Sequence, residues 1–248
     1  MKKNEIKLWA VLFWLLVWQI AAAALDSQIL LVSPVGVILR LCQLLLTAEF
    51  WRAVIFSFVK ISSGFLLAVF TASVLAVLSH RFKVVKQLIA PAMLAIRSVP
   101  VASFIILALV WLSSKNLSVF ISFLMVLPII YSSVLSGIDN CDKALLEMAG
   151  VFKMSAVRKV RYIYLSQVMP FFYSGCCAAL GLCWKAGIAA EVIGMPQGSI
   201  GEKLQQAKVY LDTPDLFGWT VVIVLISLIF ERLFLAAIRL IQRKLMRV

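Results

Sequence analysis

The stretch "LLEMAGVFKMSAVRKVRYIYLSQV", residues 145–168, is the longest interruption in a chain that otherwise consists of one apolar segment after another. Its first half carries apolar residues at the i, i+3, i+4, i+7 spacing of one helix face, namely Leu145, Met148, Ala149 and Phe152. Its second half repeats this spacing with Val157, Val160 and Tyr164, and adds the cations Arg158, Lys159 and Arg161. The pattern predicts two short amphipathic helices with a bend near residues 153–155. Ser155 is the expected N-cap of the second helix.

The composition indicates that this stretch belongs to a membrane protein. Of the 248 residues, 63% are hydrophobic and only 14% are charged, against roughly a quarter charged in an ordinary soluble domain. In a soluble protein the net charge of +13 would suggest nucleic acid. Here the cations cluster between apolar segments, as they do in loops beside a membrane. The expected partner is therefore the lipid bilayer, and no nucleic-acid partner is expected.

Six segments are long and apolar enough to cross the hydrocarbon core as helices, each with roughly 20 residues. They run approximately over residues 8–25, 54–79, 88–112, 117–136, 169–193 and 215–237. A helix closes its backbone hydrogen bonds internally, which the bilayer requires. The sequence therefore predicts an all-α membrane protein with six transmembrane helices, forming a single domain over residues 1–248.

The distribution of lysine and arginine predicts the orientation of this bundle. Sixteen of the 24 cations fall in residues 1–7, 80–87, 137–167 and 232–248, which all lie on one side of the predicted membrane. The connections on the opposite side hold only five. Because cytoplasmic loops carry the excess of lysine and arginine, both termini and the 137–167 loop are predicted to be cytoplasmic. That loop could then be a membrane-surface hairpin that meets anionic lipid, or a docking element for a cytoplasmic partner.

The N-terminal residues imitate a secretory signal, because a charged start precedes an apolar stretch and a run of alanines. The apolar stretch is longer than the usual 7–15 residues of a signal, and its removal would leave an odd number of spans. We therefore expect a retained first helix.

Few residues or motifs of the sequence indicate an enzyme. The five cysteines are scattered and show neither a disulfide pattern nor a metal-ligand spacing, so no metal site is expected. His80 is the one histidine, so an intramembrane serine protease would have to pair it with Ser174, and this is a remote alternative. No phosphate-binding G-x-x-x-x-G-K-[ST] motif occurs. If nucleoside triphosphate drives this protein, another chain must bind it.

Several segments of the sequence resemble segments of ATP-binding-cassette (ABC) importer permeases. Glu147, Ala149, Ile163 and Leu165 are spaced as in the "EAA" loop of that family, whereas Met148, Lys153 and Ser166 depart from the usual alanine, glycine and proline. The phrases "IRSVPVASFIILALVWLSSKN" (96–116), "WKAGIAAEVIG" (184–194) and "LISLIFERLF" (225–234) are similar to permeases for nitrate, sulfonates, taurine or pyrimidine vitamin precursors. The resemblance covers residues 54–236.

The resemblance implies a fold, a set of partners and a location. The fold is that of type I ABC importer permeases, in the bacterial cytoplasmic (inner) membrane. The partners are a second copy of the chain in a homodimer, two cytoplasmic ATPases that use ATP and Mg, and an extracytoplasmic solute-binding protein; the chain itself binds no cofactor. The expected ATPase-docking residues are Glu147, Met148, Ala149, Gly150, Val151, Phe152 and Lys153. The chain is thus expected to be a transport subunit and not an enzyme.

Charged residues within the predicted spans are candidates for the translocation pathway, because charges at membrane depth usually face protein or a water-filled cavity. They are Arg97, Lys185 and Glu191, with Trp184 beside them. Two cations would suit a small polar or anionic solute, but a purely structural role remains open. Glu191 lies near the outer face and is expected to be a gate or an inter-helix partner. An ATP-independent channel or secondary transporter is the main alternative for the whole chain.

Overall fold

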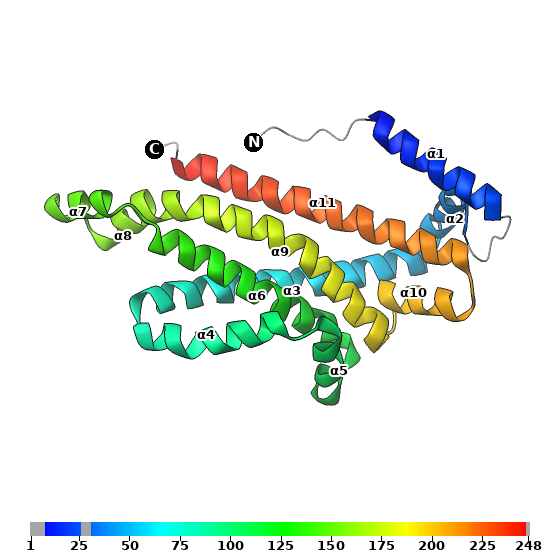
Figure 1. Ribbon diagram of the computed structural model, residues 1–248, viewed down its shortest axis with the longest axis horizontal. Helices are drawn as coiled ribbons and strands as arrows, with labels where there is room; N and C mark the ends of the chain where they lie inside the picture. Colours follow the sequence, from blue (N-terminus) through cyan, green and yellow to red (C-terminus); the bar gives the residue numbers. More distant parts are fainter. Residues whose placement is uncertain (1–7, 26–30, 247–248) are drawn as a thin grey trace.

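The computed structural model describes residues 8–25 and 31–246, and every regular element in these ranges is a helix (Figure 1). The helices are α1 (Leu8–Leu25), α2 (Pro34–Leu45), α3 (Ala48–Arg81), α4 (Lys83–Ser98), α5 (Val101–Trp111), α6 (Ser114–Asp139), α7 (Lys143–Val151), α8 (Ala156–Lys159), the π-helix η1 (Val160–Tyr164), α9 (Leu165–Gly194), α10 (Ile200–Val209) and α11 (Thr213–Met246). The predicted all-α class is confirmed for these residues.

Four helical stretches are long and apolar enough to cross a membrane: Ala48–Arg81, Ser114–Asp139, Ala156–Gly194 and Thr213–Leu240. They contain the spans predicted at 54–79, 117–136, 169–193 and 215–237. Large apolar side chains on their outer faces are open, for example Phe70 at 71% and Leu233 at 63% exposure, as expected for surfaces that meet lipid. The chain is a multi-pass membrane protein. The first predicted span forms α1, whose apolar part, Trp9–Leu25, is shorter than these four.

The prediction of one continuous helix over residues 88–112 is wrong. The chain breaks there into α4 and α5, which meet at an angle of 109°. The break falls at Val99–Pro100, where both residues have extended ψ angles of 133° and 137°. Proline lacks an N–H group and its ring disfavours helical geometry at the preceding residue, so the α4 ladder stops at Ser98. The pair could still form one broken span.

The long helices follow the long axis of the molecule, short helices lie at both of its ends, and α5 projects from its side (Figure 1). At one end α7 and α8 form the turn between α6 and α9. At the other end α2 and α10 lie beside the start of α11. The helix α11 begins at this second end and runs back towards α7, so its C-terminal part lies on the same side as α7 and α8 (Figure 1).

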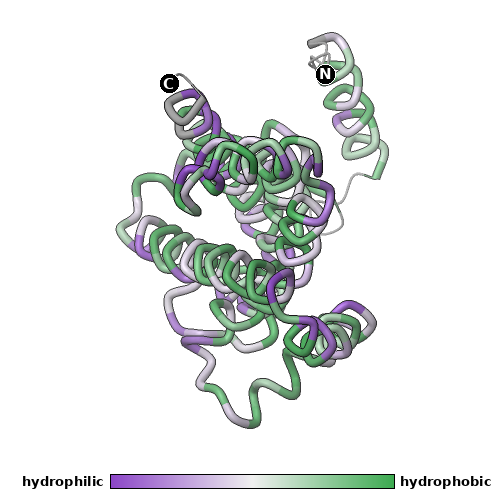
Figure 2. The backbone as a smooth tube through the Cα atoms, turned by 90° about the vertical axis from the view of Figure 1, so that its left-hand side faces the viewer, coloured by the Kyte–Doolittle hydropathy of each residue, from purple (hydrophilic) through white to green (hydrophobic). Residues whose placement is uncertain are grey.

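The centre of the bundle is the packing of α3, α6 and α9. Two glycines permit close approach: a Cβ on Gly64 would lie 2.4 Å from the carbonyl oxygen of Val119, and one on Gly187 would lie 2.7 Å from Ser122 Oγ. Such small residues let membrane helices gain dispersion contacts that lipid does not offer. Looking from the α7–α8 end, Figure 2 shows hydrophobic residues along most of the helix length and hydrophilic ones gathered in limited segments.

Candidate functional site

The α7–α8 tip, residues 143–159, is a hydrogen-bonded bend between two helices. Asp142 caps α7 by accepting a hydrogen bond from the Ala144 N–H at 2.8 Å. At the other end of α7, the Lys153 N–H donates to the Gly150 carbonyl at 3.0 Å and the Met154 N–H donates to the Ala149 carbonyl at 2.9 Å. These two bonds define a Schellman motif, in which the residue that follows the C-cap adopts the left-handed backbone conformation.

Lys153 is that left-handed residue, with φ at +50°. The family to which the sequence is similar has glycine at this position, and glycine adopts such an angle without steric cost. The lysine therefore keeps the geometry of the bend at a cost of about 1–2 kcal/mol. The predicted bend near residues 153–155 is confirmed.

The second half of the tip leads directly into the bundle. Ser155 occupies the predicted N-cap position of α8 with an extended backbone, although its side chain makes no capping hydrogen bond. The helix then passes through the π-helical turn η1 and continues without a break as α9. Residues 156–194 are thus one continuous helical stretch that links the tip with the far end of the molecule.

The tip lies at the very end of the molecule (Figure 1), and it exposes large apolar side chains. Val151 is 81% exposed, Phe152 74% and Val157 77%. Among the predicted docking residues, only Ala149 is buried; Glu147, Met148, Gly150 and Lys153 are exposed with Val151 and Phe152. The structure therefore places these residues in the C-terminal half of α7 and the turn that follows it, and their docking role stays a prediction. An exposed apolar surface that is flanked by charged residues is typical of a site where a partner protein binds.

Arg97 is the last-turn cation of α4, just before the break to α5. Its Nη2 donates to the carbonyl oxygen of Pro128 and to Ser132 Oγ, both at 2.7 Å and both on α6. The guanidinium group thus holds α4 against α6, while the side chain remains exposed. This contact supports the structural role that the sequence left open, and it leaves part of the cation accessible.

The neighbours Trp184 and Lys185 of α9 point in different directions. Trp184 is buried, with its ring centroid 6.2 Å from that of Phe58 and 6.0 Å from that of Phe230. It fills the core between α3, α9 and α11. Lys185 is exposed on the other face of α9. That face is made of small or exposed residues, namely Ser174, Ala178, Gly181, Lys185 and Ala189.

Glu191 is buried between α9, α3 and α10. Its Oε2 accepts a hydrogen bond from Ser57 Oγ at 2.6 Å and a longer one from the Gly201 N–H at 3.3 Å. The Ser57 hydroxyl in turn accepts the Ile200 N–H at 3.0 Å. Arg97, Trp184, Lys185 and Glu191 therefore do not form one cluster. The role of Ser57 was missed, because a serine within an apolar span carries no signal of its partner 134 residues away.

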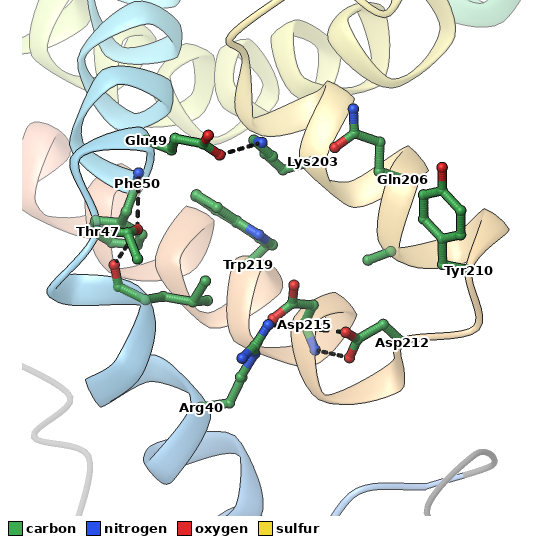
Figure 3. Close-up of a pocket in the computed structure, with 12 residues that line it drawn as sticks. Arg40, Thr47, Glu49, Phe50, Lys203, Gln206, Tyr210, Asp212, Asp215 and Trp219 are labelled. Atoms are coloured by element: carbon green, nitrogen blue, oxygen red, sulfur yellow. Dashed lines mark hydrogen bonds and ion pairs between the residues drawn. The ribbon is translucent and has the colours of Figure 1, made fainter.

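A cavity of about 550 Å³ lies at the end of the molecule opposite the tip, between α2, α3, α10 and α11 (Figure 3). Three ion pairs cross it: Lys203 Nζ lies 3.0 Å from Glu49 Oε2, and the Arg40 guanidinium contacts Asp215 and lies 4.0 Å from Asp212 Oδ2. The hydrogen bond to Asp215 raises the pKa of Arg40 above its ordinary value. Sequence reasoning also missed this cavity, because its walls come from segments 175 residues apart.

His80 takes part in an ion cluster at the same end as the tip. Its Nδ1 lies 2.8 Å from Asp139 Oδ1, and Lys86 Nζ lies 3.2 Å from Asp139 Oδ2. These contacts join the ends of α3, α4 and α6. His80 thus has a structural partner, which does not favour the remote serine protease reading.

Comparison with known proteins agrees with this geometry. The family model of the "binding-protein-dependent transport system inner membrane component" matches residues 64–247. A probable ABC transporter permease protein of Brucella melitensis is 28% identical over 223 residues, covering 90% of this chain and 89% of that protein. The putative aliphatic sulfonates transport permease protein SsuC of Bacillus subtilis is 23% identical over 234 residues, covering 93% and 83%.

Among solved structures, the crystal structure of an amino acid ABC transporter with histidines superposes with a TM-score of 0.53 at 16% sequence identity. The match covers 77% of this chain and 90% of that one, and it shows a shared fold. The resemblance to ABC importer permeases found in the sequence is thereby confirmed. With a family model that extends over most of its length, the chain belongs to the binding-protein-dependent transport system inner membrane components.

Proposed function

We propose that this chain is the permease subunit of an ABC importer and that the α7–α8 tip is where a cytoplasmic ATPase docks. The exposed apolar turn around Phe152 carries this proposal, because it stands at the end of the bundle and no described residue covers it. A short helix with an exposed aromatic gains most when that ring enters a partner's pocket. The cations of the tip then hold this end on the cytoplasmic side.

The work of transport is divided among several chains. Two ATPases bind ATP and Mg, and their closing moves the tips of two permease copies together; this chain contributes no ATPase site. In this arrangement residues 1–248 form one domain with six transmembrane helices, both termini are cytoplasmic, and the membrane is the bacterial inner membrane. The direction of α11, whose C-terminal part lies on the same side as the tip, supports the orientation of the C-terminus (Figure 1).

The substrate is a small polar or anionic solute, such as a sulfonate, nitrate, taurine or a vitamin precursor. The exposed face of α9 supports a pathway there, because it combines small residues with the cation Lys185. A second copy of the chain would close this face from the other side. The printed name of the Bacillus subtilis relative, which concerns aliphatic sulfonates, agrees with an anionic cargo. A solute-binding protein would deliver the solute at the end that carries α2 and α10.

Co-purification tests the docking role directly. The chain is expressed with candidate ATPases from its own operon, and the complex is captured through the permease. We expect Phe152→Ala to lower the retained ATPase by about tenfold, since a buried aromatic anchor contributes at least roughly 1.4 kcal/mol. Phe70→Ala is the matched control, because Phe70 is equally open at 71% exposure but lies on a lipid-facing side of α3.

The same preparation distinguishes the ABC permease from a channel or secondary transporter, and a docking tip from a membrane-surface hairpin. Glu147→Ala should weaken ATPase retention as well, since Glu147 is also exposed in the C-terminal half of α7. If no ATPase is ever retained and uptake persists without ATP, the chain is a channel or secondary transporter. If the tip binds only vesicles of anionic lipid, and both variants transport normally, the surface-hairpin interpretation holds and the docking proposal fails.

A further inference from the structure

Glu191 is the only charged side chain that is buried in the part of the chain that the structure describes, with 0% exposure. It sits near the end of a membrane-crossing stretch, where a buried carboxyl group is costly unless it is satisfied. Its hydrogen-bond partners come from two other elements: the Ser57 hydroxyl of α3 and the Gly201 N–H of α10. The Ile200 N–H of α10 donates to the same Ser57 hydroxyl. Three elements therefore converge on one carboxyl group.

At Gly201, the contact between α10 and α9 is too close for any residue larger than glycine. A Cβ on Gly201 would lie 2.3 Å from Glu191 Cβ and 2.4 Å from the Glu191 carbonyl carbon. The start of α10 thus packs directly on the backbone of α9. The N–H groups at the start of a helix lack partners within that helix, and here two of them are satisfied by Glu191 and by Ser57. The helix α10 is fixed to the bundle at this point.

The other end of the same helical stretch carries the α7–α8 tip. From Leu165 to Glu191 the helix α9 is unbroken, a length of about 40 Å. Beyond Glu191, α10 forms one wall of the 550 Å³ cavity, here called the outer cavity, through Lys203 and Gln206 (Figure 3). One continuous helical stretch, residues 156–194, therefore runs from the tip at one end of the molecule to the contact with α10 at the other.

We propose that Glu191 is a positioning residue that fastens α10 to α9, so that movement of the α7–α8 tip and movement of the outer cavity wall are coupled. This inference rests on the proposed function, since it needs a partner that moves the tip. A carboxyl oxygen can accept several hydrogen bonds at once, which lets one side chain hold a serine hydroxyl and a helix N-terminus together. Polar bonds of this kind between membrane helices restrain their relative positions.

The test uses the assembled transporter in proteoliposomes and measures two quantities: ATP hydrolysis and solute uptake, whose ratio is the coupling ratio. We expect Glu191→Ala to keep ATPase retention and basal hydrolysis but to lower uptake per ATP by about tenfold, within the usual range of coupling between sites. Glu191→Gln keeps an acceptor oxygen and should restore at least half of the ratio. Ser57→Ala should show a partial loss.

Ser62→Ala is the matched control, because Ser62 is also a buried serine of α3 and its hydroxyl has no hydrogen-bond partner among the described atoms. Its coupling ratio should remain that of the unmodified transporter. The proposal is overturned if Glu191→Ala transports the normal amount of solute per ATP, or if Ser62→Ala uncouples as strongly. Absence of any ATP hydrolysis in the unmodified complex would instead count against the proposed function.

Should Glu191→Ala fail to assemble, Gly201→Ala offers an independent approach to the same contact. The added methyl group separates α10 from α9 without removing the carboxyl group. The same loss of coupling is expected, and normal coupling in Gly201→Ala would overturn the proposal.

Discussion

Ser57 and Glu191 are joined by a hydrogen bond of 2.6 Å between Ser57 Oγ and Glu191 Oε2, although 134 residues separate them in the sequence. Both side chains are completely buried. The bond connects the first part of α3 with the last part of α9, and the Ile200 N–H adds α10 to it. This small network lies opposite the α7–α8 tip, and α9 runs between the two.

Removing the Ser57 hydroxyl should destabilise the protein more than removing the Ser62 hydroxyl. Ser57→Ala leaves the Glu191 carboxyl and the Ile200 N–H without one partner each, whereas the Ser62 hydroxyl has no partner to lose. We expect Ser57→Ala to lower the free energy of unfolding by about 1–2 kcal/mol. Thermal unfolding in detergent measures the difference, and equal melting temperatures for the two variants would contradict the assignment.

Two glycines of the bundle should respond in opposite ways to alanine. In Gly201→Ala the new methyl group collides with α9, so the amide of Ile200 should lose its partner and exchange its hydrogen faster. In Gly181→Ala the methyl group meets nothing within 4 Å in the protomer, and the gain in helix propensity stabilises α9 by up to about 1 kcal/mol. Hydrogen exchange of α10, followed by mass spectrometry, should change only in the first variant.

Gly181 also tests the proposed second copy. It lies on the exposed face of α9, where a protomer alone has room for a large side chain. If a second copy covers this face, Gly181→Leu should raise the dissociation constant of the homodimer by about tenfold or more while the monomer remains folded. Native mass spectrometry or light scattering measures the mass. A fully dimeric Gly181→Leu protein would show that the interface lies elsewhere.

Lys153 should be one of the few positions where glycine stabilises a helical turn. Its φ of +50° strains a lysine, so Lys153→Gly should stabilise the bend by about 1 kcal/mol. Hydrogen exchange at the Met154 amide, which closes the bend, should slow by roughly fivefold. Lys159→Gly is the opposite control: Lys159 has a helical φ of −58°, and glycine there should destabilise α8 by about 1 kcal/mol.

Lys185 should influence transport without influencing assembly, because its side chain is exposed on α9 and shows no ion pair with the described residues. With an anionic solute, Lys185→Ala should lower the uptake rate by about tenfold, and Lys185→Arg should retain most of it. Initial rates at saturating binding protein measure this effect. Normal uptake by a normally assembled Lys185→Ala transporter would remove Lys185 from the proposed pathway.

The position of the bend in the α7–α8 tip could be predicted because its signals are local, whereas the second helix is not a separate short one but the start of the stretch 156–194. Helical spacing in the first half and cations in the second act within a few residues, and the structure has the bend where they place it, although the Ser155 side chain makes no capping hydrogen bond. The break in the predicted span at 88–112 was missed, although Pro100 marks it. Hydropathy averaged over 20 residues does not register a single proline, whereas the backbone turns by 109° there.

The sequence by itself determined the class of this protein. Apolar segments of about 20 residues must form helices in a bilayer, and lysine and arginine between them predict an orientation, because both effects depend on composition along the chain. Only the tertiary structure decided which side chains meet. It placed Glu191 against Ser57 and α10, Arg97 against α6, and Trp184 in the core, while Lys185 stayed open. Such contacts join segments far apart in sequence, and they depend on how the helices pack rather than on any local pattern.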